Sequence, residues 1–121
     1  DLVRQLARDG EGATRLVTVE VSGARSAAQA DLAARRIANS LLVKTAIFGG
    51  DPNWGRIMQT LGAGGVAWHR EKTRVRIGGV AVFLKGRSAG PAARKRAEKA
   101  LKAEEILIQD ELGQGRGDGV E

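Results

Sequence analysis

The sequence has no cysteine, and His69 is its single histidine. Disulfide bonds and thiolate metal sites are therefore excluded, and a histidine cluster for structural zinc cannot form. Aromatic residues make up 3% of the chain, so the core must be built from Val, Ile, Leu and Ala. No apolar run approaches the roughly 20 residues that span a bilayer, and the first residues do not form a signal peptide. We therefore expect a cytoplasmic protein.

The charge is moderately basic, with 20 Lys and Arg against 14 Asp and Glu, which gives a formal net charge of +6. The positive residues are scattered along the chain or gather on the polar side of one expected helix. They are not interleaved with exposed aromatics, as they are on surfaces that bind single-stranded nucleic acid. We therefore expect neither nucleic acid nor a membrane as a partner. A chain of 121 residues is long enough for one core, so we expect a single domain over 1–121.

The first half of the chain shows strand and helix patterns in alternation. Residues 1–8 have a short helical pattern with Leu2, Val3 and Leu6, whereas residues 15–22 alternate in the manner of a half-buried strand. Ser26 with Gln29 forms a capping box that opens a helix with a narrow alanine face. Residues 41–48 fit either a short helix or a buried strand.

The second half adds further strands and one more helix. Strand-like runs occupy 66–68, 74–77 and 80–84, with a glycine turn between the last two. Pro91 starts a basic helix that reaches about residue 103, and residues 106–108 suggest a final strand. This order predicts an α+β domain of two layers, in which helices pack on one face of a mixed or antiparallel sheet.

The run from Asp51 to Arg56 reads as the start of a helix. Asp51 is the expected N-cap and Pro52 the first helical residue, while an apolar face begins at Trp54. Gly55 weakens a helix unless another group needs to come close to it. A departure from local rules in such a short stretch indicates a specific structural or functional role.

Glu11 is the sharpest candidate for a binding residue because it lies between Gly10 and Gly12. No neighbouring side chain blocks its carboxylate, which could hold a substrate ammonium by a charge-assisted hydrogen bond. The alternative is an ordinary turn with a solvated acid. Lys44, in an apolar stretch, either extends from a packed segment to solvent or points at an anion. Arg56 is expected to pair with Asp51, one turn away.

Four strings occur in one order: DGEGAT at 9–14, IANS at 37–40, LVKTA at 42–46 and GDPNWGR at 50–56. Together they closely resemble the C-terminal region of the β chain in the ornithine acetyltransferase (glutamate N-acetyltransferase) family of arginine biosynthesis. The resemblance covers nearly the whole chain, and DGEGAT together with DPNWGR is highly specific.

This resemblance implies an enzyme whose precursor cleaves itself before a threonine, producing an α chain and a β chain. The threonine takes the acetyl group from N-acetylornithine and passes it to glutamate. Some members also accept acetyl-CoA, so acetyl-CoA is a candidate co-substrate, and no other cofactor is expected. The family's substrate-binding glutamate in DGEGAT corresponds to Glu11. The family further implies an α2β2 heterotetramer, with the α chain and the rest of the β chain as partners.

Two features of the family pattern have no match here. The threonine-containing cleavage motif is missing, and so is the C-terminal segment whose Asn and Ser or Thr contact substrate. We therefore expect both ends to be truncated, no catalytic residue in this chain and no activity from the chain alone. A stand-alone binding or interaction domain that kept the fold and lost the chemistry is the alternative.

Overall fold

The computed structural model describes residues 3–9 and 15–114, which form one sheet and four α-helices. The sheet has six strands in the order β1-β2-β6-β3-β4-β5. None of the helices in these described residues is long and apolar enough to cross a membrane. The elements are β1 (Val3–Arg8), β2 (Leu16–Ser22), α1 (Ala27–Asn39), α2 (Leu41–Phe48), α3 (Trp54–Ala63), a 3₁₀ turn (Arg70–Lys72), β3 (Arg74–Ile77), β4 (Val80–Leu84), β5 (Arg87–Ser88), α4 (Pro91–Ala100) and β6 (Glu105–Glu111).

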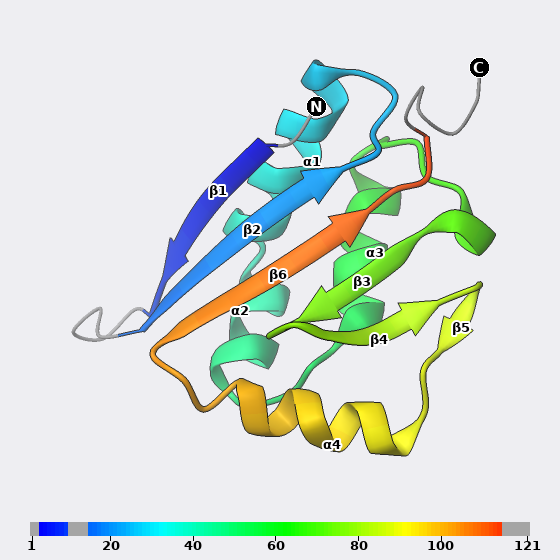
Figure 1. The fold of residues 1–121 in the computed structure, drawn as a ribbon. Helices are drawn as coiled ribbons and strands as arrows, with labels where there is room; N and C mark the ends of the chain where they lie inside the picture. Colours follow the sequence, from blue (N-terminus) through cyan, green and yellow to red (C-terminus); the bar gives the residue numbers. More distant parts are fainter. Residues whose placement is uncertain (1–2, 10–14, 115–121) are drawn as a thin grey trace.

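Two layers make up the domain, as predicted. In Figure 1, helices α1, α2 and α3 lie behind the sheet, and α4 crosses its lower end between β5 and β6. The parallel pair of β2 and β6 lies in the middle of the sheet, and all other strand pairs are antiparallel. The expected α+β class with a mixed sheet is therefore confirmed.

The core lies between the sheet and the helices. In the central strands, every second side chain points into this core. Val17, Val19 and Val21 of β2 are buried, and so are Ile106 and Ile108 of β6. The same alternation places Asp110 of β6 on the buried side. From the helices, the alanine face of α1 is buried as expected, which brings this helix close to the sheet.

The capping box that opens α1 forms only in part. Ser26 Oγ accepts a hydrogen bond from Gln29 N at 3.1 Å, which confirms Ser26 as the N-cap. The Gln29 side chain accepts from the backbone N of Ala67 at 3.0 Å. The side chain of Gln29 therefore joins α1 to the chain that follows α3.

Two glycines form the turn between β3 and β4, and both have positive φ angles, 61° at Gly78 and 82° at Gly79. This is the backbone that a two-residue turn needs to match the twist of its strands. Gly78 also lies against α4, because a Cβ atom there would be 2.4 Å from the Ala100 Cβ. The predicted hairpin is confirmed, and Gly78 has a packing role as well.

The helical pattern expected over 1–8 is wrong for the described part, since residues 3–8 form strand β1. Val3 to Arg8 pair antiparallel with Val21 to Leu16 of β2. Six residues are too few to set a helical period, and backbone pairing along the edge of the sheet decides the outcome. Arg4 and Arg8 point outward, which is the alternation of a strand.

Three further expectations are revised or resolved. The strand expected at 66–68 is absent, because this stretch has no ladder partner and connects α3 to the 3₁₀ turn. The ambiguous segment 41–48 is helix α2, capped by Ser40 Oγ, which accepts from Val43 N at 3.2 Å. Helix α4 ends at Ala100 rather than near residue 103.

Candidate functional site

The connection between β1 and β2 contains Glu11, and a backbone hydrogen bond joins the two residues that flank it. Asp9 N donates to Arg15 O at 3.1 Å, directly beyond the last paired residues of the two strands. Glu11 itself lies outside the described residues, so its predicted role stays a prediction. The structure does show the hydrogen bonds that hold Asp9 and Arg15, the described residues on either side of this segment.

Arg15 connects this end of the hairpin to two helices. Its Nη1 donates to the Phe48 carbonyl at the end of α2 at 3.0 Å, and its Nη2 donates to the Leu101 carbonyl just after α4. The guanidinium carbon also lies 5.5 Å from the centre of the Phe48 ring, within the range of a cation–π contact. Leu16 N donates to Glu104 O at 2.8 Å, so the backbone is held as well.

Lys44 lies on the same helix as Phe48, and it is half-buried. Lys44 and Ala7 of β1 are among the residues that line a small cavity of about 10 Å³ between the sheet and the helices. Aliphatic surroundings of this kind suit a lysine stem whose ammonium extends to solvent. The role of Lys44 therefore stays a prediction.

Helix α3 begins two residues later than expected. Its N-cap is Asn53, whose Oδ1 accepts from Arg56 N at 3.0 Å, and its first helical residue is Trp54. The prediction of Asp51 as N-cap and Pro52 as first helical residue is therefore wrong. Both Asp and Asn are good N-caps. The preference for proline at the first helical position favoured Asp51, whereas the structure uses Asn53. A Cβ at Gly55 would lie 3.3 Å from Asn53 Oδ1, so glycine leaves room for the cap.

Asp51 has a different role, because its side chain joins the start of α3 to α4. It accepts from Asn53 Nδ2 at 3.1 Å and pairs with Arg94 Nη2 at 3.2 Å. The expected pair between Asp51 and Arg56 does not form. Arg56 instead donates to the carbonyl of Leu42 in α2 at 3.1 Å. The DPNWGR segment thus connects three helices, which accounts for its departures from the local rules of a helix.

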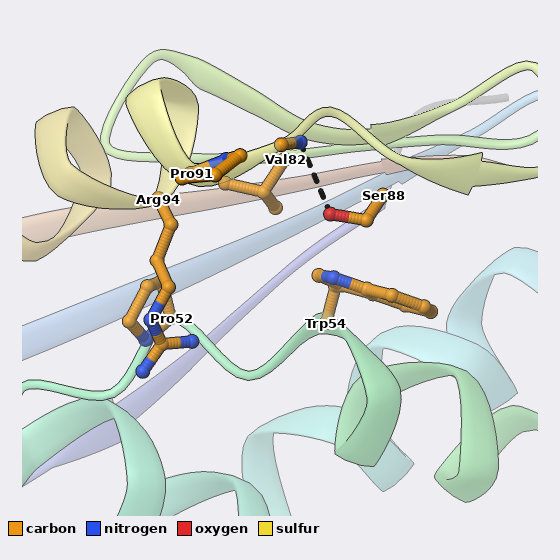
Figure 2. A pocket seen from close by; sticks show the side chains of 7 residues that line it. Pro52, Trp54, Val82, Ser88, Pro91 and Arg94 are labelled. Carbon is orange, nitrogen blue, oxygen red and sulfur yellow. Dashed lines mark hydrogen bonds between the residues drawn. The ribbon is translucent and has the colours of Figure 1, made fainter.

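A separate pocket of about 290 Å³ lies where the starts of α3 and α4 face β4 and β5. Figure 2 shows the Trp54 ring and the Pro52, Pro91 and Val82 side chains around it, with Arg94 at its edge. Gly90 N donates to Ser88 Oγ at 3.1 Å. Arg94 is already paired with Asp51 and with Glu98 at 2.9 Å, so its charge is largely balanced. The walls are mainly apolar, which suits packing rather than binding of a charged substrate.

Asp110 is the buried acid of the described chain, with no exposed surface. Burial, with a smaller contribution from the neighbouring charge of Glu111, raises the pKa of the Asp110 carboxyl to about 7. Neither oxygen has a hydrogen-bond partner among the described residues. Asp110 lies on the buried side of β6, so the protonation of its carboxyl bears on the stability of the fold.

The described residues offer little for metal chemistry. No group of three or more His, Cys, Asp or Glu that could hold a metal ion occurs within 3–9 and 15–114. His69 is exposed, and it contributes through its backbone, with its N donating to Leu112 O at 3.1 Å and its O accepting from Thr73 Oγ1 at 2.7 Å.

Sequence reasoning missed Arg15, Asn53 and Asp110. The alternation of β6 already placed Asp110 in phase with Ile106 and Ile108, so its burial was visible in the pattern. No local signal identifies the partners of Arg15, because Phe48 and Leu101 are 33 and 86 residues away along the chain.

Comparison with known proteins gives one consistent result. A family model described as the ArgJ family matches residues 1–120. The curated arginine biosynthesis bifunctional protein ArgJ of Bacillus licheniformis is 43% identical over 119 residues, which is 98% of this chain and 29% of that protein. The protein of the same name from Wolinella succinogenes is 45% identical over 117 residues, 96% of this chain and 30% of its own.

A solved structure has the same fold. The crystal structure of the arginine biosynthesis bifunctional protein ArgJ from Bacillus halodurans matches with a TM-score of 0.80 and 40% sequence identity. The match covers 90% of this chain and 51% of that one. The chain therefore spans about half of the matched structure, and 29% and 30% of the two curated relatives.

Proposed function

Because the chain belongs to the ArgJ family, we propose that it is part of a glutamate N-acetyltransferase of arginine biosynthesis. The whole enzyme moves an acetyl group from N-acetylornithine to glutamate. The family match over residues 1–120 carries this proposal, and the solved relative with 40% identity supports it. The named relatives are about three times longer, so most of such an enzyme lies outside these 121 residues.

The chemistry is acyl transfer through a threonine that this chain does not contain. The threonine oxygen attacks the acetyl carbonyl of N-acetylornithine, and ornithine leaves with a proton on its amine. The amine of glutamate then attacks the acetyl-threonine and restores the hydroxyl. Donors that stabilise the intermediate oxyanion come from the α chain.

In this proposal, the described domain frames the substrate pocket, and Glu11 binds a substrate ammonium. The structure supports this role indirectly, because both ends of the segment that carries Glu11 are fixed. Asp9 and Arg15 are hydrogen-bonded to each other, and Arg15 is tied to two helices.

Further parts of the proposal concern the whole enzyme. The α chain and the rest of the β chain complete the pocket, in an α2β2 assembly in the cytoplasm that arises by self-cleavage. Acetyl-CoA is a candidate second acetyl donor, and no other cofactor is required.

The test uses the complete protein that contains this chain, assayed for acetyl transfer from N-acetylornithine to glutamate. We expect Glu11→Ala to raise KM for the amino-acid substrates much more than it impairs self-cleavage. Glu104→Ala is the matched control, because Glu104 is an exposed acid close to the same end of the hairpin. Unchanged kinetics in Glu11→Ala would remove the assignment of Glu11, and no acetyl transfer by the parent protein would favour the stand-alone binding domain.

A further inference from the structure

A polar pocket lies between the 3₁₀ turn at Arg70–Lys72 and the connection from β4 to β5. Its volume is about 390 Å³, and Lys72, Arg74 and Lys85 are among the residues that line it. In Figure 1, the 3₁₀ turn and the β4–β5 connection lie at the same end of the sheet. The pocket therefore brings together basic residues from two separate segments of the chain.

Lys85 has a backbone conformation that lysine rarely adopts. Leu84 pairs with Arg87, so Lys85 and Gly86 form a two-residue hairpin turn, with φ angles of 53° and 82°. Such a turn needs positive φ at both central residues, and asparagine, aspartate or glycine normally occupies its first position. Lys85 is the one residue other than glycine with positive φ in the described part of the chain. A residue that opposes the backbone preference of its turn indicates that its side chain has a role.

The hairpin turn is held against the 3₁₀ turn. Gly86 is buried although it lies at the tip of a hairpin. The Glu71 side chain covers it, since a Cβ at Gly86 would be 3.0 Å from Glu71 Oε2. A Cβ at Gly113 would lie 2.5 Å from the Lys72 Cβ, so the chain after β6 packs directly on Lys72. The segments that carry Lys72 and Lys85 are therefore fixed relative to each other before any ligand binds.

The charges around the pocket are not balanced. Three cations line it, Lys72, Arg74 and Lys85, against one acid, Glu71. Neither lysine forms an ion pair with a described residue. The Arg74 Nη1 is 3.9 Å from Glu111 Oε1, and a neighbouring arginine shares the same carboxylate at 3.7 Å, so Arg74 is only partly balanced. The lining groups therefore carry an excess of two positive charges, which repel one another until an anion binds.

The lining residues also favour one class of anion. A phosphate group carries nearly two negative charges at neutral pH and offers several acceptor oxygens, which matches this excess. The same cations would repel the ammonium of a free amino acid. Leu84 is the one apolar side chain among the lining residues, which include no aromatic ring on which a nucleic-acid base could stack.

We propose that this pocket binds a phosphate group, which Lys72, Arg74 and Lys85 hold by charge-assisted hydrogen bonds. The phosphate is either the free ion or the phosphate of a small ester, since both present the same oxygens. This inference goes beyond acetyl transfer, in which no residue of the pocket has a role. It therefore stands or fails separately from the role of Glu11.

The experiment measures the dissociation constants of inorganic phosphate and glycerol 3-phosphate for the complete protein that contains this chain, by calorimetry at neutral pH and constant ionic strength. It compares the parent with Lys85→Asn, Lys72→Gln and Lys95→Gln. Lys95→Gln is the matched control, because Lys95 is an exposed lysine of α4 that does not line the pocket. We expect each pocket variant to weaken binding about threefold and the double variant about tenfold, since each substitution removes one exposed charge contact. Binding to Lys95→Gln should be unchanged.

Lys85→Asn also separates a loss of binding from a loss of folding. Asparagine suits the first position of this turn better than lysine, so the melting temperature without ligand should stay the same or rise while phosphate binding weakens. A lower melting temperature would show that Lys85 stabilises the turn, and it would overturn the inference.

The two probes distinguish the source of the phosphate. Tighter binding of glycerol 3-phosphate identifies an ester as the ligand, and tighter binding of inorganic phosphate identifies the free ion; both results support the site. Three results would overturn it: no phosphate binding to the parent, equal dissociation constants for the parent and the pocket variants, or an equal loss of binding in Lys95→Gln.

Discussion

Replacing Asp110 with asparagine isolates one pH-dependent part of the free energy of unfolding. The Asp110 carboxyl is fully buried on β6, and burial raises its pKa to about 7 from a model-compound value of 3.8. In the folded chain it keeps its proton up to nearly neutral pH, whereas in the unfolded chain it loses the proton near pH 4. Between these two pH values the folded state binds more protons, so raising the pH favours unfolding.

The size of the effect follows from the two pKa values. Stability from this group is fully present below pH 3.8 and is lost as the pH rises through about 7. The slope is about 1.4 kcal/mol per pH unit within that window, and the loss between pH 5 and pH 8 is about 2–3 kcal/mol. This is a large fraction of the stability of a small domain.

Urea unfolding of the 121-residue chain at pH 5, 6, 7 and 8 measures this effect. We expect the parent and Glu105→Gln, which changes an exposed acid on the same strand, to lose stability across this range. The Asp110→Asn chain should lack about 2–3 kcal/mol of that loss, because its side chain does not titrate. Its absolute stability is a separate matter, since a buried amide needs partners of its own. Parallel pH profiles for the parent and Asp110→Asn would refute the reasoning.

Two other predictions concern turns and caps. Asn53→Ala removes the N-cap of α3 and should lower the free energy of unfolding by about 1 kcal/mol in urea unfolding, and a chain of unchanged stability would contradict the assignment of the cap. Gly78→Ala and Gly79→Ala both place alanine at a positive φ, but only at Gly78 would the new Cβ meet Ala100, at 2.4 Å, with nothing within 4 Å at Gly79. The melting temperature should therefore fall further in Gly78→Ala, and equal shifts would show that packing against α4 is unimportant.

Local sequence patterns predict those elements in which apolar and polar residues alternate or in which a capping or turn residue marks an end. Strand β2, helix α1 and the β3–β4 hairpin follow from such signals, because each depends on neighbours along the chain. Strand β1 was not predicted, because its six residues show no clear hydrophobic period. Its structure depends on pairing with β2. The start of α3 was misplaced because Asp51 and Asn53 are both good caps, and the ion pair from Asp51 to Arg94 spans 43 residues.

In the candidate site, too, residues marked by their sequence neighbours could be predicted, whereas contacts between distant segments could not. The sequence singled out Glu11 because of its glycine neighbours, and the family resemblance gave it a role. The anchoring by Arg15 could not be predicted, because it joins three segments that only the folded chain brings together. Contacts of this kind depend on the packing of α2 and α4 rather than on spacing in the sequence.

The affinity for L-ornithine, the product that keeps the substrate's free ammonium, tests the central claim most directly. Calorimetry on the complete enzyme measures its Kd for the parent and for the Glu11→Ala and Glu104→Ala variants. A charge-assisted hydrogen bond of about 1.5–3 kcal/mol predicts that Glu11→Ala weakens binding by about 10- to 150-fold, with Glu104→Ala unchanged. Equal dissociation constants for the parent and Glu11→Ala would contradict the account.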